Sequence, residues 1–311
     1  MSNPVKIGIP RALLCHKYFV MWEEFFKTLG CQIVLSPETN QQILKEGLKL
    51  AVDESCLSLK ILLGHAYYLK DKADVLFLPR IVSSHKGEST CVKLWALTDI
   101  VRNTIPGIEV IDYTVDFNEF KFESIEMFKV GWQFSKNPVK IIQAYLKGKE
   151  KLAEKHAKEL KEQWELIKNN KKVKPSVLIV SHPYTTYDAY LGQPIINFLK
   201  LQGINVLLSD IVDHAKARKL VRNISTDMYW TYNKEIVGAI EYYKGHIDGI
   251  LFLMTFPCGP DSLVIDLCQN KIKDIPIVVI TLDELQAEAG LKTRLESFAD
   301  ILKMRKKKNG K

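Results

Sequence analysis

Six cysteines are the side chains of this sequence best suited to chemistry, and their surroundings divide them into two groups. Cys15 and Cys268 fall inside predicted helices, and Cys31 opens a predicted strand. A thiol in such a place is most simply a small buried hydrophobic group. In a reducing compartment none of the six should form a structural disulfide.

Cys56, Cys91 and Cys258 instead lie among polar and turn residues. Cys56 stands in VDESCLS between two predicted helices, and the other two follow the ends of predicted strands. In open α/β sheets, ligands bind beyond the carboxyl ends of the strands. Three thiolates would leave one coordination position open on a metal or cluster, which is typical of a site that does chemistry. The spacing forms no close CxxC pairs of the zinc-ribbon or ferredoxin kind.

Cys258 has the most informative surroundings, because MTFPCGPDS contains a strand end, a proline, the cysteine and the start of a helix. Backbone N–H groups at a helix N-terminus stabilise a thiolate. The flanking proline and glycine predict a tight turn with room for a bulky ligand. The same residues also fit a structural turn in which the cysteine is incidental.

Other polar residues occupy strand-to-helix turns. His182 and Tyr184 lie in one such turn, SHPYTTYD, and Arg11 occupies the matching turn near the N-terminus, where it could face an anion. A turn stabilised by its own polar side chains explains the first two equally simply. His65, in ILLGHAYYL, is typical of a core histidine. No GxGxxG follows the first strand, and no P-loop or GxSxG motif is present, so a standard nucleotide or hydrolase site is not supported.

The elements that position these residues alternate between strand and helix, which predicts parallel α/β sheets. The predicted strands are Val5–Ile9, Gln32–Leu35, Val75–Leu78, Val177–Val180 and Ile275–Ile280. The predicted helices are Leu13–Leu29, Asn40–Ala51, Leu57–Leu69, Val92–Arg102, 140–170 and Leu291–Lys303. The polar stretch SSHKGEST before Cys91 is expected to be a loop.

The two halves of the chain have the same layout. KIGIPRALL…KTLGCQIVLSP and SVLIVSHPYTTYD…KLQGINVLLSD each give a strand, a proline-containing turn, a helix, a glycine, a second strand and a serine. We therefore expect an α/β protein of two Rossmann-like domains with parallel sheets and an approximate internal repeat, joined by a long helical segment. The expected boundaries are 1–120 and 173–303 for the domains, 121–172 for the helical connector and 304–311 for a basic tail.

The net charge of +8 invites a nucleic-acid interpretation, but the last nine residues hold six basic and no acidic residues, so the rest of the chain carries only +2. A solvated basic end explains this better than a nucleic-acid interface. No apolar run approaches the length of a membrane span, and the N-terminus lacks a secretory pattern. We expect a cytoplasmic protein that binds neither membrane nor nucleic acid.

Several motifs of the chain are distinctive: GIPRALL, AVDESC, FLPRIVS, HPYTTYD, the YW of Tyr229–Trp230, FPCGPDS and EAGLKTRLESFADIL. Together they resemble the family of 2-hydroxyacyl-CoA dehydratase and benzoyl-CoA reductase subunits, and more closely its branch described as acyl-CoA dehydratase activase-related. Double-cubane-cluster proteins are similar too. The resemblance implies a [4Fe–4S] or double-cubane cluster between the two domains, held on Cys56, Cys91 and Cys258. It also implies a partner, an ATP-dependent iron–sulfur activase that injects a low-potential electron. In the dehydratases that electron forms a ketyl radical of an acyl-CoA thioester.

The sequence departs from the family pattern near its C-terminus, where relatives read LDEHTGEAG and this chain reads LDELQAEAG. Leu285 replaces a histidine and Ala287 a glycine. His182 and Glu284 are the candidates for proton transfer.

Three basic residues, Arg11, Arg80 and Lys93, are candidates to balance the charge of an anionic cluster. Arg11 is also counted among the cofactor-binding residues.

Three functions remain open from the sequence. The first is an iron–sulfur protein for low-potential electron transfer or reduction that acts with an activase within a homo- or hetero-oligomer. Its substrate would be an acyl-CoA thioester or another small molecule reduced at low potential. The second is a non-catalytic cluster carrier or scaffold. The third is a two-domain binder of a small ligand whose cysteines are structural.

Overall fold

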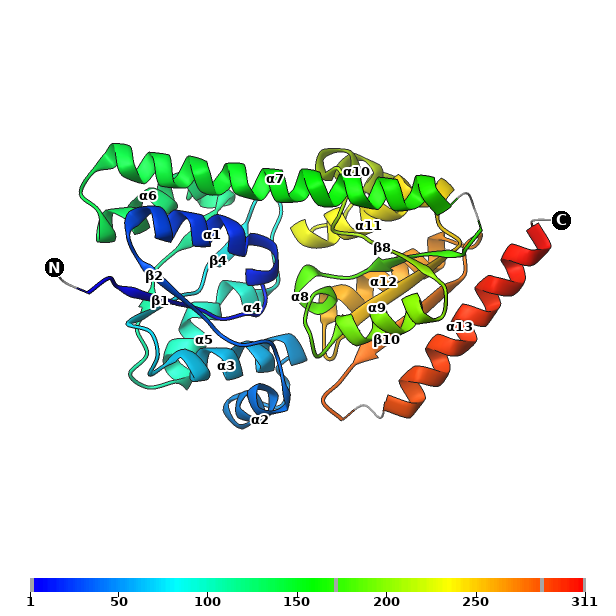
Figure 1. Cartoon of the computed structure of the whole chain (residues 1–311), viewed down its shortest axis with the longest axis horizontal. Helices are drawn as coiled ribbons and strands as arrows, with labels where there is room; N and C mark the ends of the chain where they lie inside the picture. Colours follow the sequence, from blue (N-terminus) through cyan, green and yellow to red (C-terminus); the bar gives the residue numbers. More distant parts are fainter. Residues whose placement is uncertain (1–2, 171–172, 286–287, 310–311) are drawn as a thin grey trace. The chain divides into compact units, whose positions relative to one another are not determined.

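The computed structural model describes residues 3–170, 173–285 and 288–309 and divides into two compact units (Figure 1). The first unit contains the chain up to Lys155 together with Tyr229–Thr231. The second contains His156–Met228 and the chain from Tyr232 onward. Each unit is described below by itself.

A four-stranded parallel sheet forms the centre of the first unit, in the order β2-β1-β3-β5. Its strands are β1 (Lys6–Ile9), β2 (Gln32–Leu35), β3 (Val75–Phe77) and β5 (Val110–Ile111). A small two-stranded sheet pairs β4 (Arg80–Ser83) with β6 (Thr114–Asp116). In Figure 1, helix α1 lies on one side of the larger sheet and helices α3 and α5 lie on the other. This is the layering expected of a doubly wound α/β unit.

Helices connect the strands of the first unit. They are α1 (Cys15–Leu29), α2 (Gln41–Leu50), α3 (Leu57–Leu69), α4 (Val92–Trp95), α5 (Leu97–Thr104) and α6 (Glu123–Phe134), with a 3₁₀ turn η1 at Phe117–Glu119. Helix α7 (Pro138–Asn170) begins in the first unit and continues into the second. The central helix α3 is apolar on most of its surface and buried along most of its length, as a helix enclosed by other elements must be.

The second unit has a parallel sheet in the order β10-β9-β7-β8. Its strands are β7 (Ser176–Val180), β8 (Asn205–Leu208), β9 (Gly249–Thr255) and β10 (Ile277–Leu282). Its helices are α8 (Pro183–Thr186), α9 (Gly192–Leu201), α10 (His214–Leu220), α11 (Thr231–Tyr243), α12 (Gly259–Lys271) and α13 (Glu288–Asn309), with 3₁₀ turns η2 (Val221–Asn223) and η3 (Lys244–His246). Every residue of β7 and β9 is buried, which explains why these strands are continuous rather than alternating apolar runs.

The strand orders confirm the predicted α/β class with two parallel Rossmann-like sheets and an internal repeat. Read in equivalent strands, β2-β1-β3-β5 and β8-β7-β9-β10 are the same order. The repeat extends to a hydrogen bond after the first strand of each sheet. The backbone N–H of Arg11 donates to Ser36 Oγ at 2.8 Å, and that of Ser181 donates to Ser209 Oγ at 3.3 Å. The serine that ends the second strand therefore fixes the turn after the first strand in both units.

One local prediction was wrong, and strand β4 was not predicted. The single helix expected over Val92–Arg102 is two helices that meet at Ala96, whose φ of −88° and ψ of 5° end α4. The bend lets both Leu94 and Leu97 turn inward and become buried. Strand β4 pairs with β6, its alternate residues Ile81 and Ser83 are buried, and it overlaps the predicted SSHKGEST loop at Ser83 alone.

The basic C-terminal stretch also differs from expectation, because α13 continues to Asn309, beyond the predicted end at Lys303. Within it, the Nζ atom of Lys306 donates to Asp248 at 2.7 Å and 2.8 Å. Lys306, at least, is therefore paired with an acidic residue of the second unit.

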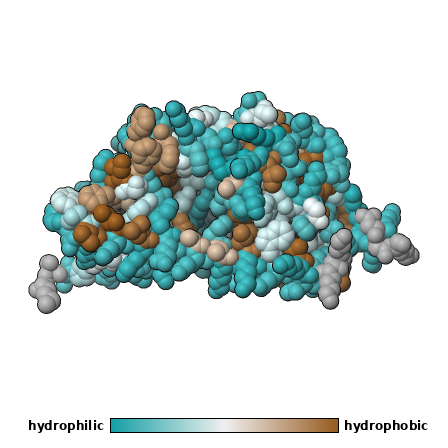
Figure 2. Space-filling view, turned by 90° about the horizontal axis from the view of Figure 1, so that it is seen from above, coloured by the Kyte–Doolittle hydropathy of each residue, from teal (hydrophilic) through white to brown (hydrophobic). Residues whose placement is uncertain are grey.

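Apolar side chains are exposed on α6 and on the start of α7, within the first unit: Ile125, Trp132, Val139, Ile142 and Leu146. Figure 2 shows apolar side chains gathered at this end of the first unit. In the described part of the chain, no helix is both long enough and apolar enough to cross a membrane.

Candidate functional site

The three cysteines singled out from the sequence occupy the same structural position. Cys56, Cys91 and Cys258 are the N-cap residues of α3, α4 and α12. Their carbonyl oxygens accept the first backbone hydrogen bonds of these helices, at 2.9, 2.9 and 3.0 Å. All three are partly exposed. Because the first N–H groups of a helix carry partial positive charge, this is a position that favours a thiolate.

The other three cysteines have the opposite environment. Cys15, Cys31 and Cys268 are buried. Burial raises the pKa of Cys15 and of Cys268 to about 12, and that of Cys31 to about 11. These thiols stay protonated near neutral pH, and the interpretation of them as apolar packing groups is consistent with their burial.

The predicted ligand cysteines are divided between the two units. Cys56 and Cys91 belong to the first unit, and Cys258 to the second. Among the residues that the structure describes, no group of three or more His, Cys, Asp or Glu side chains lies together as a metal site would require. The three-cysteine ligand set therefore stays a prediction.

His182 pairs with an acid that sequence reasoning missed. Its Nε2 lies 3.0 Å from Oδ1 of Asp261, and both side chains are buried. His182 follows β7 and Asp261 opens α12 after β9, so the contact lies at the carboxyl ends of two neighbouring strands. Tyr184 stacks on the imidazole with 4.9 Å between ring centroids and 15° between the planes. This edge of a parallel sheet is where α/β proteins bind ligands.

Asp261 is the centre of a small polar network in the second unit. Asn233 Nδ2 donates to the same Oδ1 atom at 2.8 Å, and the Cys258 side chain also forms a hydrogen bond with the carboxylate. Burial is the largest influence and opposes ionisation, but the neighbouring His182 and the hydrogen bonds from His182, Asn233 and Cys258 together lower the pKa of Asp261. An ionised carboxylate is thus held directly beside Cys258. The acid three residues after the cysteine, in PCGPD, was the signal in the sequence.

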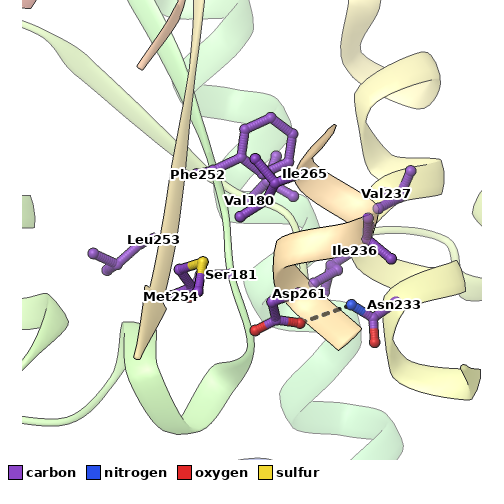
Figure 3. A pocket seen from close by; sticks show the side chains of 11 residues that line it. Val180, Ser181, Asn233, Ile236, Val237, Phe252, Leu253, Met254, Asp261 and Ile265 are labelled. Atoms are coloured by element: carbon purple, nitrogen blue, oxygen red, sulfur yellow. Dashed lines mark hydrogen bonds between the residues drawn. The ribbon is translucent and has the colours of Figure 1, made fainter. Parts of the chain in front are cut away.

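A small cavity adjoins this network (Figure 3). Asp261, Asn233 and Ser181 supply its polar atoms, and apolar side chains of β7, β9, α11 and α12 supply the rest. The space open to a water-sized group is about 10 Å³. A cavity of this size holds about one water molecule and excludes any organic substrate.

The predicted basic residues have partners inside the first unit. Arg11 Nε donates to the carbonyl oxygen of Ser36 at 3.2 Å, and its guanidinium lies 3.7 Å from Glu38. Arg80 forms an ion pair with Asp99 at 2.8 Å. The structure gives Lys93 no contact that bears on a cluster.

Sequence reasoning also missed Lys60, which is 4% exposed on α3. Its backbone N–H donates to the carbonyl oxygen of Cys56 at 3.1 Å, one helical turn away. A lysine within the apolar run LSLKILLG was the available signal, because lysine is rarely buried without a role.

Glu284 lies after the end of β10 and is partly buried. A hydrogen bond with Glu284 is the main cause that raises the pKa of the adjacent Asp283, with burial and the charge of Glu284 adding to it. The carboxyl group of Glu284 thus favours the protonated form of Asp283. Leu285 is 88% exposed, and Ala287 lies outside the described residues.

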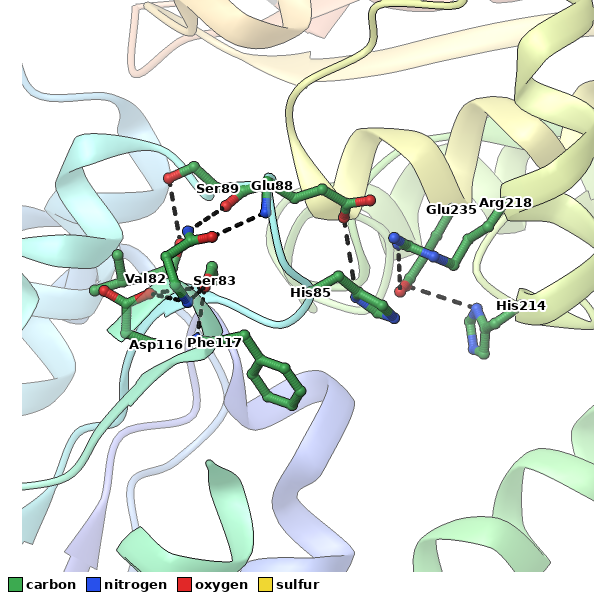
Figure 4. Close-up of polar contacts among 12 residues, drawn as sticks. Val82, Ser83, His85, Glu88, Ser89, Asp116, Phe117, His214, Arg218 and Glu235 are labelled. Atoms are coloured by element: carbon green, nitrogen blue, oxygen red, sulfur yellow. Dashed lines mark hydrogen bonds and ion pairs between the residues drawn. The ribbon is translucent and has the colours of Figure 1, made fainter. Parts of the chain in front are cut away.

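The loop before Cys91 is held by hydrogen bonds within the first unit (Figure 4). Ser83 Oγ donates to Asp116 Oδ1 at 2.8 Å and accepts from the backbone N–H of Phe117 at 2.8 Å. Ser89 also pairs with the Tyr229–Thr231 segment, since its N–H donates to Tyr229 O and its carbonyl accepts from Thr231 N. A segment far along the chain therefore fixes the approach to Cys91.

A second polar cluster shown in Figure 4 belongs to the second unit. Glu235 is buried and lies 3.6 Å from His214 and 3.9 Å from Arg218. His214 stacks on His156, with 4.6 Å between ring centroids. These residues join α7, α10 and α11 and form no part of the predicted site.

Solved structures resemble the chain only distantly. The cadmium-bound and manganese-bound periplasmic metal-binding protein from Candidatus Liberibacter asiaticus aligns over 96% of this chain and 99% of its own, with 12% identity and a TM-score of 0.28 in both cases. A likeness at this level supports no statement about the present chain. No curated protein matches the sequence.

A family model matches residues 6–212, which include Cys56, Cys91 and His182, whereas Cys258 and Glu284 lie beyond the match. The match covers about two thirds of the sequence, including most of the first unit and the first two strands of the second sheet. The chain therefore belongs to the family described as CoA enzyme activase uncharacterised domain (DUF2229).

Proposed function

We propose that this chain is an iron–sulfur protein for low-potential electron transfer or reduction that acts with an ATP-dependent activase in acyl-CoA metabolism. The family description supports the link to the activation of CoA enzymes. One observation supports the proposal of a cluster above all others. The three predicted ligand cysteines are all partly exposed helix N-caps, while the other three cysteines are buried.

The donor set fits an iron–sulfur cluster by its chemistry. Thiolates are the usual protein ligands of such clusters, and hydrogen bonds and local charge tune the potential. Cys56, Cys91 and Cys258 would hold the cluster, and the partial positive charge at each helix start would stabilise the bound thiolates. When bound, the cluster would supply one-electron transfer at low potential.

The neighbouring residues have separate roles in this proposal. The S–H of Cys258 donates to Asp261 only in the cluster-free protein, because a cluster-bound thiolate has no proton to donate; Asp261 would then keep its contacts with His182 and Asn233. Lys60, which follows Cys56 by one turn of α3, would balance part of the negative charge of the cluster. His182, whose Nε2 lies 3.0 Å from Asp261, would serve as the proton-transfer group.

The exposed apolar side chains of α6 and α7 support a protein partner, because a patch of this kind is costly to leave in water. The predicted partners are the activase and further subunits of a homo- or hetero-oligomer. An acyl-CoA thioester is the proposed substrate.

The test is the iron and acid-labile sulfide content of anaerobically purified protein, with visible and EPR spectra. Wild type is compared with Cys56→Ser, Cys91→Ser and Cys258→Ser, and Cys268→Ser is the matched control. We expect about four irons or more per wild-type chain, lost in the first three variants and kept in the control. Wild-type protein that binds no iron after reconstitution would refute the proposal and favour a two-domain binding protein.

A cluster that moves intact to an acceptor protein, without any turnover, would instead favour the carrier function. Comparing cluster transfer with acyl-CoA turnover on the same sample separates the two.

A further inference from the structure

The second nitrogen of His182 is an unsatisfied buried group. Nδ1 is shielded from solvent and has no hydrogen-bond partner among the described residues, and the side chain as a whole is 7% exposed. A buried polar atom without a partner has lost its hydrogen bonds to water without gaining a replacement. Such an atom needs an explanation in a native structure.

The contacts of Asp261 determine which nitrogen carries the proton. Oδ1 of Asp261 accepts a hydrogen bond from Asn233 Nδ2 and lies 3.0 Å from His182 Nε2. A carboxylate is only an acceptor, so the imidazole must present an N–H to it. In the neutral ring the proton is then on Nε2, and Nδ1 keeps its lone pair.

We propose that Asp261, supported by Asn233, is a positioning residue that fixes His182 with Nδ1 as the acceptor for an O–H or N–H group of a bound ligand. An ionised carboxylate or a carbonyl oxygen cannot occupy this place beside the neutral ring, because each is only an acceptor, as Nδ1 is. Turnover at this atom would break the ligand O–H bond and form N–H on Nδ1, with Asp261 stabilising the imidazolium. The location of the ligand near Cys258 rests on the proposed function; the protonation of the ring does not.

The surroundings limit how a ligand can approach the ring. The cavity next to Asp261 has room only for a water-sized group. One ring face is covered by Tyr184, stacked at 4.9 Å. A donor bound at Nδ1 would be enclosed away from bulk water, where a hydrogen bond is stronger, and local movement of the side chains around the ring must admit it.

The test uses the full chain with ¹⁵N-labelled histidine, and NMR reads which imidazole nitrogen carries the proton. The His182 signals are those lost in His182→Gln. We expect the wild type to carry its proton on Nε2 alone, and Asp261→Ala to lose this single tautomer. If Asp261→Ala fails to fold, Asp261→Asn takes its place, because its neutral oxygen holds the tautomer less firmly. A proton on Nδ1 in the wild type would overturn the inference.

A second arm tests the ligand class with two probes that differ by one hydroxyl, lactyl-CoA and propionyl-CoA. We expect lactyl-CoA to shift the Nδ1 signal and propionyl-CoA to leave it unchanged. Equal shifts, or none with either probe, would overturn the acceptor role. Iron content measured on the same samples distinguishes the two proposals: iron-free wild type that still shows the Nε2 proton refutes the cluster and leaves this inference standing.

Discussion

His182 and Asp261 stand 79 residues apart in sequence, yet His182 Nε2 lies 3.0 Å from Asp261 Oδ1. The contact exists because β7 and β9 are neighbours in the sheet and both residues follow the ends of these strands. It joins a titratable ring to the helix that Cys258 begins. We therefore expect the stability of the second unit to depend on this contact.

Removing the Asp261 carboxylate should destabilise the second unit. Asp261→Ala leaves His182 Nε2 and Asn233 Nδ2 buried without an acceptor, which costs about 2–4 kcal/mol. Urea unfolding, followed by hydrogen exchange in β7 and β9, measures the change. Asp266→Ala is the control, because Asp266 is exposed on the same helix and should change stability by less than about 0.5 kcal/mol. Equal effects of the two substitutions would contradict the role of the network.

Thiol reactivity should separate the six cysteines into two groups in cluster-free protein. At pH 8 a thiol with a pKa of about 12, as in Cys15 and Cys268, is ionised on the order of 10³-fold less than an ordinary thiol. Cys56, Cys91 and Cys258 should therefore be alkylated by iodoacetamide long before the buried three.

Peptide mass spectrometry of timed samples checks this order. Alkylation of Cys268 as fast as Cys258 would show that its burial does not hold in solution. Unfolding in urea is the control and should make all six react at similar rates.

Close packing of α2 on α3 should be intolerant of any side chain at two glycines. A Cβ at Gly47 would lie against the carbonyl of Lys60, and one at Gly64 against the carbonyl of Ile43. Either alanine substitution forces the helices apart and should cost about 1–3 kcal/mol.

Thermal unfolding of the first unit, with iron content as a second measurement, tests this. Gly245→Ala is the control, because no atom lies within 4 Å of its added Cβ. Because α3 begins at Cys56, we expect Gly64→Ala to lower iron content as well, whereas Gly245→Ala should keep both stability and iron.

Acid should destabilise the first unit well before its carboxylates are protonated. Burial, with the nearby charges of Arg11 and the other histidine, lowers the pKa of His65 to about 3, and burial with Arg11 lowers that of His16 to about 4. The unfolded chain binds protons on both rings below its ordinary pKa of about 6.5, and the folded chain does not. This stability is thus fully present above about pH 6.5 and is lost as the pH falls toward 4 and 3.

Lowering the pH from 7 to 5 should reduce the free energy of unfolding by up to about 2 kcal/mol for each histidine. Urea midpoints at these two pH values measure it, and His65→Gln should flatten the dependence. His246→Gln, at an exposed position, is the control. An unchanged slope in His65→Gln would show that this ring titrates normally in the folded state.

The sequence by itself determined the two-unit α/β architecture. Apolar runs bounded by glycine and proline, and helices with periodic apolar faces, are local signals, and Leu57–Leu69 was predicted to the residue. The layout repeat anticipated the equal strand orders. Turn and loop context also sorted Cys56, Cys91 and Cys258 from the buried thiols.

Local signals failed where a short segment depends on a distant partner. Strand β4 is a strand only because β6 pairs with it, and the break at Ala96 arises from burying Leu94 and Leu97 together. The residues of these two segments do not by themselves reveal either dependence.

The contacts of the candidate site were decided by tertiary structure alone. His182 meets Asp261 because β9 pairs beside β7 even though β8 comes between them in sequence. Asn233 reaches the same carboxylate from α11. Sheet order places residues from distant segments at one edge, and since it arises from burial of both sheet faces rather than from any single segment, no local pattern could have specified it.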